Sequence, residues 1–175
     1  MANGNSHIEG TLIEHLLGQP LSPLLRANDP VLWMAELAWL NLLQPARPGE
    51  VTVLERQVIA AFAAVLLGDP ACISHYRGVL MAQSPELAAR IEAEALRAAG
   101  TAPFRLSPGT VRMVGTRLAE GLEQVARPAR DTPGWSPEAR AVLDSIVALV
   151  AFQARVVTGL RAVLGHTDAD ARRAA

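Results

Sequence analysis

The sequence has no lysine, a single cysteine and a single tyrosine, and only 4% of its residues are aromatic. One cysteine cannot form an internal disulfide, which excludes the disulfide-rich secreted scaffolds. All 16 basic residues are arginine, and 17 acidic residues bring the net charge to −1. So small a charge produces no strong field for nucleic acid or anionic lipid, and we expect neither as a partner.

Long apolar runs are also missing. The longest uninterrupted one, residues 58–68, is too short to span a bilayer. The first ten residues, "MANGNSHIEG", lack the basic and apolar regions of a signal peptide. These features predict a cytoplasmic protein without a membrane span.

What the sequence does contain is helix-forming material. Half of its 175 residues are hydrophobic and 19% are charged, a globular composition long enough for a substantial core. No segment alternates convincingly as a strand would, so we predict an all-α fold forming a single domain over residues 1–175. The expected helices cover residues 8–17, 22–27, 30–44, 53–67, 70–83, 85–99, 108–126 and 137–164.

The helix starts carry a recurrent signature, a small polar residue followed by proline, which supplies an N-cap and a first helical residue. It occurs at residues 22–23, 29–30, 69–70, 84–85, 107–108 and 136–137. Thr52 and Glu55 form a capping-box pattern. Gly100 and Gly165 stand where glycines end helices. The tail, residues 166–175, lacks an apolar face and is expected to fray.

A weak internal repeat relates residues 51–80 to residues 135–164. The two segments align without a gap, and both begin with a capped helix and end in an R-x-V-L pattern. We interpret them as two related helical-hairpin lobes around a pseudo-twofold axis. The break at Gly68-Asp69-Pro70 in the first lobe would correspond to one long helix in the second.

The stretch "TVLERQVIAAFAAVLLGDPACISHYRGVLM" resembles the core of the alkylhydroperoxidase D-like and carboxymuconolactone decarboxylase superfamily. Members of this family carry a redox dithiol on a helix of the type S-x-x-E-R-E-x-x-x-x-x-V-x-x-x-x-x-C-x-x-C-x-x-x-H. The segment "IVALVAFQARVVTGLRAVLG" is similar to the C-terminal helix of the two-lobed, peroxidase-related members. The resemblance implies the family's two-lobed helical fold.

The family's catalytic signature is incomplete in this chain. Asp69 stands at the position of the first family cysteine, and Cys72 matches the second. The family histidine falls on Tyr76, with His75 one place early, and the glutamate of the proton relay falls on Gln57. Cys72 and His75 are therefore the candidate catalytic residues, and the other three are degenerate motif positions.

With one thiol, no Cys-x-x-Cys disulfide can close, and Gln57 cannot pass a proton. The resemblance therefore implies peroxidase ancestry without dithiol peroxidase activity. Three functions stay open: a one-cysteine peroxidase-related antioxidant, a carboxymuconolactone decarboxylase-like enzyme acting on a small organic substrate, and a non-catalytic protein that binds an apolar metabolite or a partner enzyme. No cofactor is implied, and the family's assemblies suggest a homo-oligomer, a dimer, trimer or hexamer.

Each candidate residue also has a structural interpretation. Asp69 can be the N-cap of a helix beginning at Pro70, which places Cys72 at the third helical position. There the helix dipole could lower the pKa of the thiol, or the thiol could be an inert core group. His75 lies one turn further on, and Tyr76 could end in a buried hydroxyl. We expect this group to face a crevice between the lobes.

Two further observations concern charged and metal-ligating side chains. Arg155 interrupts the apolar helix at residues 137–164, so it must be paired or reach solvent, and Gln153 can supply polar contacts nearby. His7 and His15 have no matching set of ligands in the sequence, so we expect no metal site.

Overall fold

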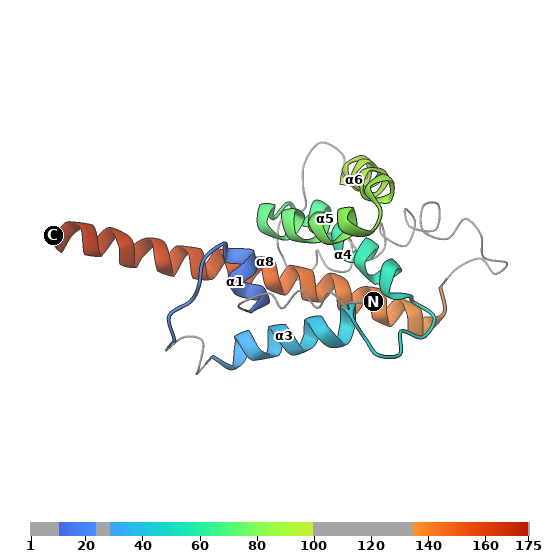
Figure 1. Cartoon of the computed structure of the whole chain (residues 1–175), viewed down its shortest axis with the longest axis horizontal. Coiled ribbons are helices and arrows are strands. Elements are labelled where there is room, and N and C mark those ends of the chain that lie inside the picture. The colour runs from blue at the N-terminus through green and yellow to red at the C-terminus, as the bar shows by residue number, and fades with distance from the viewer. Residues whose placement is uncertain (1–10, 24–28, 100–134, 175) are drawn as a thin grey trace, which may run out of the picture.

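The computed structural model describes residues 11–23, 29–99 and 135–174. Over these residues the protein is all-α, with six helices and no strand, which confirms the all-α part of the predicted fold. The helices are α1 (Leu12–Leu17), α3 (Pro30–Leu43), α4 (Val53–Leu67), α5 (Pro70–Gln83), α6 (Pro85–Ala99) and α8 (Pro137–Ala174) (Figure 1). The predicted helix over 108–126 lies outside the described residues, as do all but the first two residues of the one over 22–27.

The predicted caps account for most helix starts. The side chains of Asp29, Asp69, Ser84 and Ser136 each accept a hydrogen bond from a backbone N–H of the first helical turn. Thr52 and Glu55 form the predicted capping box. The first helix begins later than the predicted residue 8, because Thr11 caps it in a second capping box.

Helix α4 lies at the centre of the molecule. Twelve of its fifteen residues are buried, and α5, α6, α8 and α3 pack around it. Its alanines leave room for close neighbours, and Phe62 fills the centre with no exposed surface. Helix α8 runs along the long axis of the molecule and also contacts α1, α3 and α5 (Figure 1).

The predicted end of the last helix is wrong. Helix α8 continues through Gly165 to Ala174, so Gly165 does not terminate it and the segment predicted to fray is helical. Glycine costs only about 1 kcal/mol in a helix interior, which a helix already formed over 28 residues tolerates. The red end of α8 extends past the other helices in Figure 1.

Within the described residues, α8 also holds one segment, Pro137–Gly165, that is long and apolar enough to cross a membrane. Gln153 and Arg155 interrupt it, which is why no uninterrupted apolar run marks it in the sequence. Half of its most apolar window is buried inside the protein, as in a core helix. Arg155 itself is exposed to solvent, one of the two solutions predicted for it.

One buried arginine holds the connection between α3 and α4. The Arg56 guanidinium donates to the carbonyl oxygens of Val51 (2.9 Å), Leu42 (2.8 Å) and Pro48 (2.7 Å). Three carbonyl partners replace the water that a guanidinium loses on burial. The loop therefore docks against the start of α4 although it is rich in proline and glycine.

Candidate functional site

The helix start that carries the cysteine has the predicted geometry. Helix α4 ends at Gly68, whose φ of 71° is in the left-handed region, and α5 begins at Pro70. Asp69 Oδ1 accepts a hydrogen bond from the Cys72 backbone N–H at 2.8 Å. Asp69 is therefore an N-cap, as predicted.

The Cys72 thiol is part of the core. Its side chain has no exposed surface. Burial raises the pKa of the thiol far above its ordinary value, and the Asp69 carboxylate raises it further, whereas Arg161 acts weakly in the opposite direction. A thiol whose pKa is raised stays protonated at neutral pH, and a protonated thiol is a poor nucleophile.

Tyr76 links two helices. Its hydroxyl donates to Gln153 Oε1 of α8 at 2.6 Å, and both side chains are almost completely buried. Burial, followed by the nearby Cys72, raises the pKa of the phenol. The predictions that Tyr76 ends in a buried hydroxyl and that Gln153 supplies polar contacts are both confirmed.

Gln57 lies far from the cysteine. Its Oε1 accepts a hydrogen bond from Gln83 Nε2 at the last residue of α5. Cys72 is 11 residues before Gln83, which is about 16 Å along a helix axis. The structure therefore brings Asp69, Cys72, His75 and Tyr76 together and places Gln57 at the other end of α5.

His75 is buried, and its ring meets two other aromatic rings edge-on. The ring centroids are 5.1 Å from His15 and 4.9 Å from Tyr76. Its Nε2 has no hydrogen-bond partner among the described residues. Burial first, and then the neighbouring His15, lower the pKa of His75 to about 4, so the ring is neutral at physiological pH.

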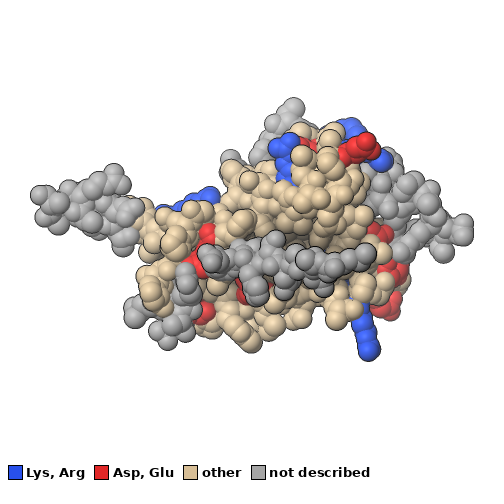
Figure 2. All heavy atoms as spheres, in the orientation of Figure 1, with Lys and Arg blue, Asp and Glu red and all other residues tan. Residues whose placement is uncertain are grey.

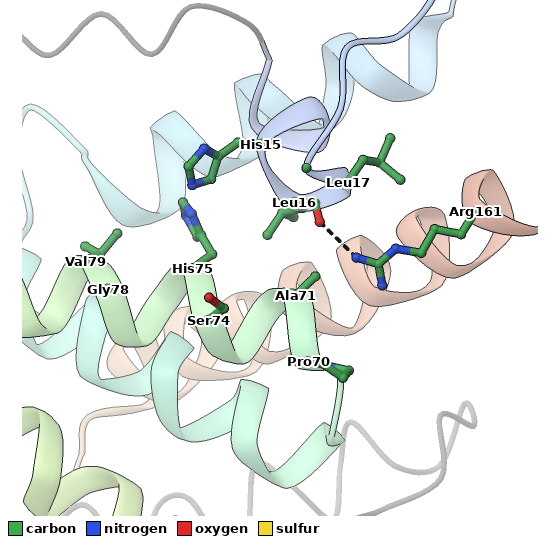
Figure 3. Close-up of a pocket in the computed structure, with 11 residues that line it drawn as sticks. His15, Leu16, Leu17, Pro70, Ala71, Ser74, His75, Gly78, Val79 and Arg161 are labelled. Atoms are coloured by element: carbon green, nitrogen blue, oxygen red, sulfur yellow. Dashed lines mark hydrogen bonds between the residues drawn. The ribbon is translucent and has the colours of Figure 1, made fainter. Parts of the chain in front are cut away.

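A hollow of about 560 Å³ opens beside His75, between α1, α5 and the Arg161 turn of α8 (Figure 3). We call it the α1–α5–α8 hollow. It is lined by His15, Leu16, Leu17, Gly18, Pro70, Ala71, Ser74, His75, Gly78, Val79 and Arg161. Cys72 is not among these residues, so the prediction that the cysteine faces a crevice is wrong, and only His75 does so.

Sequence reasoning missed two of the polar side chains in this hollow. His15 lies 60 residues before His75, and it approaches His75 only because α1 packs against α5. Arg161 Nη2 donates to the Leu16 carbonyl oxygen at 3.2 Å. No local pattern marks either residue, whereas Arg155, the arginine singled out in the sequence, lies on α8 but does not line the hollow.

The hollow lacks a metal-ligand set. Among the residues that the structure describes, no three His, Cys, Asp or Glu side chains are placed to hold a metal ion. His15 and His75 face each other without a third ligand of that kind, and His7 lies outside the described residues. A second hollow, between α4, α5 and α6, measures about 10 Å³ and is too small for an organic ligand.

Comparisons with known proteins identify no relative: no family model, no curated protein and no solved structure matches this chain.

The first prediction concerns the Cys72 thiol. In the native protein, we expect iodoacetamide to label Cys72 slowly, with no rate plateau near pH 7, because the thiol is buried and protonated. Guanidinium-unfolded protein should label at the rate of a free cysteine, which controls for thiol integrity. Mass spectrometry of timed samples measures both rates. Fast native labelling that slows in His75→Ala would contradict this prediction.

The second prediction concerns His75 and pH. Because its pKa is about 4 in the folded protein and 6.5 ordinarily, the unfolded chain binds a proton between these values that the folded chain does not. The contribution of neutral His75 to the free energy of unfolding is fully present above pH 6.5. It decreases as the pH falls and is lost below pH 4, and the total loss is at most about 3 kcal/mol. Urea unfolding from pH 7 to pH 4 measures it.

The His75→Gln variant should lose most of this pH dependence, since glutamine does not titrate. His15→Gln serves as the comparison: it removes only the smaller cause of the low pKa and should retain most of the slope. If His75→Gln keeps the full slope, another group is responsible.

Proposed function

We propose that this protein is a degenerate, two-lobed relative of the alkylhydroperoxidase D-like and carboxymuconolactone decarboxylase superfamily. In this proposal it has lost dithiol peroxidase activity and binds a small molecule in the α1–α5–α8 hollow. The related segments 51–80 and 135–164 are part of the proposed ancestry. In support, α8 is one long helix where the first segment is broken between α4 and α5.

The single observation that carries the functional proposal is the direction of Cys72. The thiol is in the core, while the hollow lies along other residues of α5. A peroxide or a resolving thiol would have to reach a sulfur that has no exposed surface. The same burial opposes the one-cysteine peroxidase, because peroxide reduction needs a thiolate.

The neighbouring motif positions support the same proposal because each takes part in a structural hydrogen bond. Asp69 caps α5, Tyr76 bonds Gln153, and Gln57 bonds Gln83. None of the three is placed as an acid or base beside an accessible thiol. His75 is neutral and lines the hollow, where it is available to a ligand rather than to the sulfur chemistry.

The third prediction tests the loss of peroxidase activity. With an organic hydroperoxide and a dithiol-disulfide reductant system, we expect turnover no faster than the protein-free background, because the thiol is protonated and inaccessible. Cys72→Ser should give the same trace. Peroxide-dependent reductant consumption that is present in the wild type and absent in Cys72→Ser would overturn the proposed function.

A homo-oligomer is the second part of the proposal, and α3 supplies its candidate surface. Five apolar side chains are exposed along this helix, namely Val31, Trp33, Met34, Leu37 and Leu40, and Trp33 is 64% exposed. The only charged residue of α3, Glu36, accepts a hydrogen bond from the Leu12 N–H at 2.8 Å. In Figure 2, charged atoms gather around α6 and along the right-hand edge, and others are scattered over the left and lower parts of this face.

A second copy of the chain fits this surface better than a charged partner does. The exposed row on α3 contains no charge of its own to pair with such a partner. A net charge of −1 produces little repulsion between copies. Pairing the two rows removes apolar surface from water, which favours association.

The fourth prediction follows from this surface. We expect light scattering at tens of micromolar to give a mass of at least two chains, and Trp33→Glu combined with Met34→Glu to shift it toward one chain. The control is Leu96→Glu, which places a charge at an equally exposed apolar position on α6. A monomeric wild type, or equal effects of both variants, would contradict the proposed oligomer.

A further inference from the structure

The α1–α5–α8 hollow contains a guanidinium and no carboxylate among its described side chains. Arg161, His15 and His75 line it, and its described lining contains no Asp or Glu. The acidic residue next to it in sequence, Asp69, already accepts the Cys72 N–H. A cation entering the hollow would meet a guanidinium and no carboxylate among these side chains, whereas an anion would meet donors.

Arg161 is held at the edge of the hollow by the end of α1. Its Nη2 donates to the carbonyl oxygen of Leu16, in the last turn of that helix (Figure 3). A guanidinium has five N–H donors, and this bond uses one of them. The remaining donors of an oriented arginine suit the two oxygens of a carboxylate.

His75 provides the second, independent sign of a ligand. The residue is 8% exposed, lines the hollow, and leaves Nε2 without a hydrogen-bond partner among the described residues. A buried polar atom without a partner is unfavourable, so a ligand that supplies an acceptor to it gains affinity. The His15 ring lies over His75 in Figure 3, and because His15 is exposed it can rotate aside.

The rest of the wall is apolar. Leu16, Leu17 and Val79 contribute aliphatic surface, and Gly18 and Gly78 have open space beside them. A volume of about 560 Å³ is within the range of small-molecule pockets. The hollow therefore combines an anion-binding edge with an apolar wall.

We propose that the α1–α5–α8 hollow binds a small carboxylic acid with an apolar body, whose carboxylate contacts Arg161 and whose other end lies beside His75. The apolar body lies against the leucines of α1 and Val79. One arginine matches the single charge of a carboxylate, and a phosphate dianion would leave charge uncompensated. This inference deepens the proposed function and rests on it.

The fifth prediction tests the ligand class by isothermal titration calorimetry of the full chain with octanoate, octanamide and octylammonium. We expect octanoate to bind saturably and to exceed both other probes. Arg161→Met should weaken octanoate by about tenfold or more, because a charge-assisted hydrogen bond is lost. Arg155→Met is the matched control, an exposed arginine six residues earlier on the same helix, and should bind as the wild type does.

His75→Gln gives a second test that does not depend on the net charge. It should also weaken octanoate, and thermal unfolding of each variant verifies that the fold is retained. If Arg161→Met fails to fold, the wild type alone decides the ligand class. Two measurements then suffice: the affinity ranking of the three probes, and the displacement of octanoate by inorganic phosphate. If inorganic phosphate displaces octanoate at a concentration below the Kd of octanoate, the hollow prefers phosphate, and the proposal of a carboxylate ligand is overturned.

Failures of the two proposals are distinguishable. Equal binding of octanamide and octanoate, both unaffected by Arg161→Met, would overturn the carboxylate while leaving a small-molecule site. No saturable octanoate binding would overturn the inference alone, provided that peroxide turnover is absent from the same preparation. Cys72-dependent peroxide turnover would overturn the proposed function itself.

Discussion

The burial of α4 on all sides is the constraint on which the rest of this structure depends. An isolated helix exposes every face to water, so one with twelve buried residues out of fifteen requires neighbours around its whole circumference. Helices α5 and α6, together with α8 and α3, provide them. The alanines of α4 allow this close approach, and the reversal at Gly68 returns α5 antiparallel along its side. The positions of Cys72 and His75 follow from that reversal, because α5 begins two residues later.

Helical periodicity then divides α5 into two functionally different faces. Cys72, Tyr76 and Leu80 recur every four residues and are all buried in the core. Ala71, Ser74, His75 and Gly78 follow an adjacent face and line the hollow. A thiol on the first face cannot serve a ligand on the second unless α5 rotates, and the Tyr76–Gln153 hydrogen bond opposes that rotation. Proximity in sequence between Cys72 and His75 therefore does not make them one site.

Local signals in the sequence predict the helices well, because each start depends on residues within one turn. Thr52 with Glu55, and Asp69 with Pro70, define helix starts without any tertiary contact. The same reasoning fails at Gly165, where tertiary and helical context override a weak local preference. It also fails for the hollow, because the contact between His15 and His75 depends on how α1 packs against α5. The part of the candidate site that lies on α5 was therefore predictable from the sequence, and the contacts that α5 makes with other helices were not.

The degenerate motif positions show why restoring a thiol would not restore dithiol chemistry, on the ancestry proposed here. Asp69→Cys would remove an N-cap worth about 1 kcal/mol while leaving Cys72 in the core. Tyr76→His would break the hydrogen bond to Gln153, whose Nε2 already lacks a partner among the described residues, and leave both polar ends of a buried amide unpaired. Gln57→Glu would place a carboxylate in a buried position beside Gln83, at the far end of α5. Asp69 caps α5, Tyr76 bonds α5 to α8, and Gln57 bonds α4 to α5, so on the proposed ancestry each of these three reversions would cost stability. None of these residues lines the α1–α5–α8 hollow, so substitutions in the hollow can change what it binds without disturbing these hydrogen bonds.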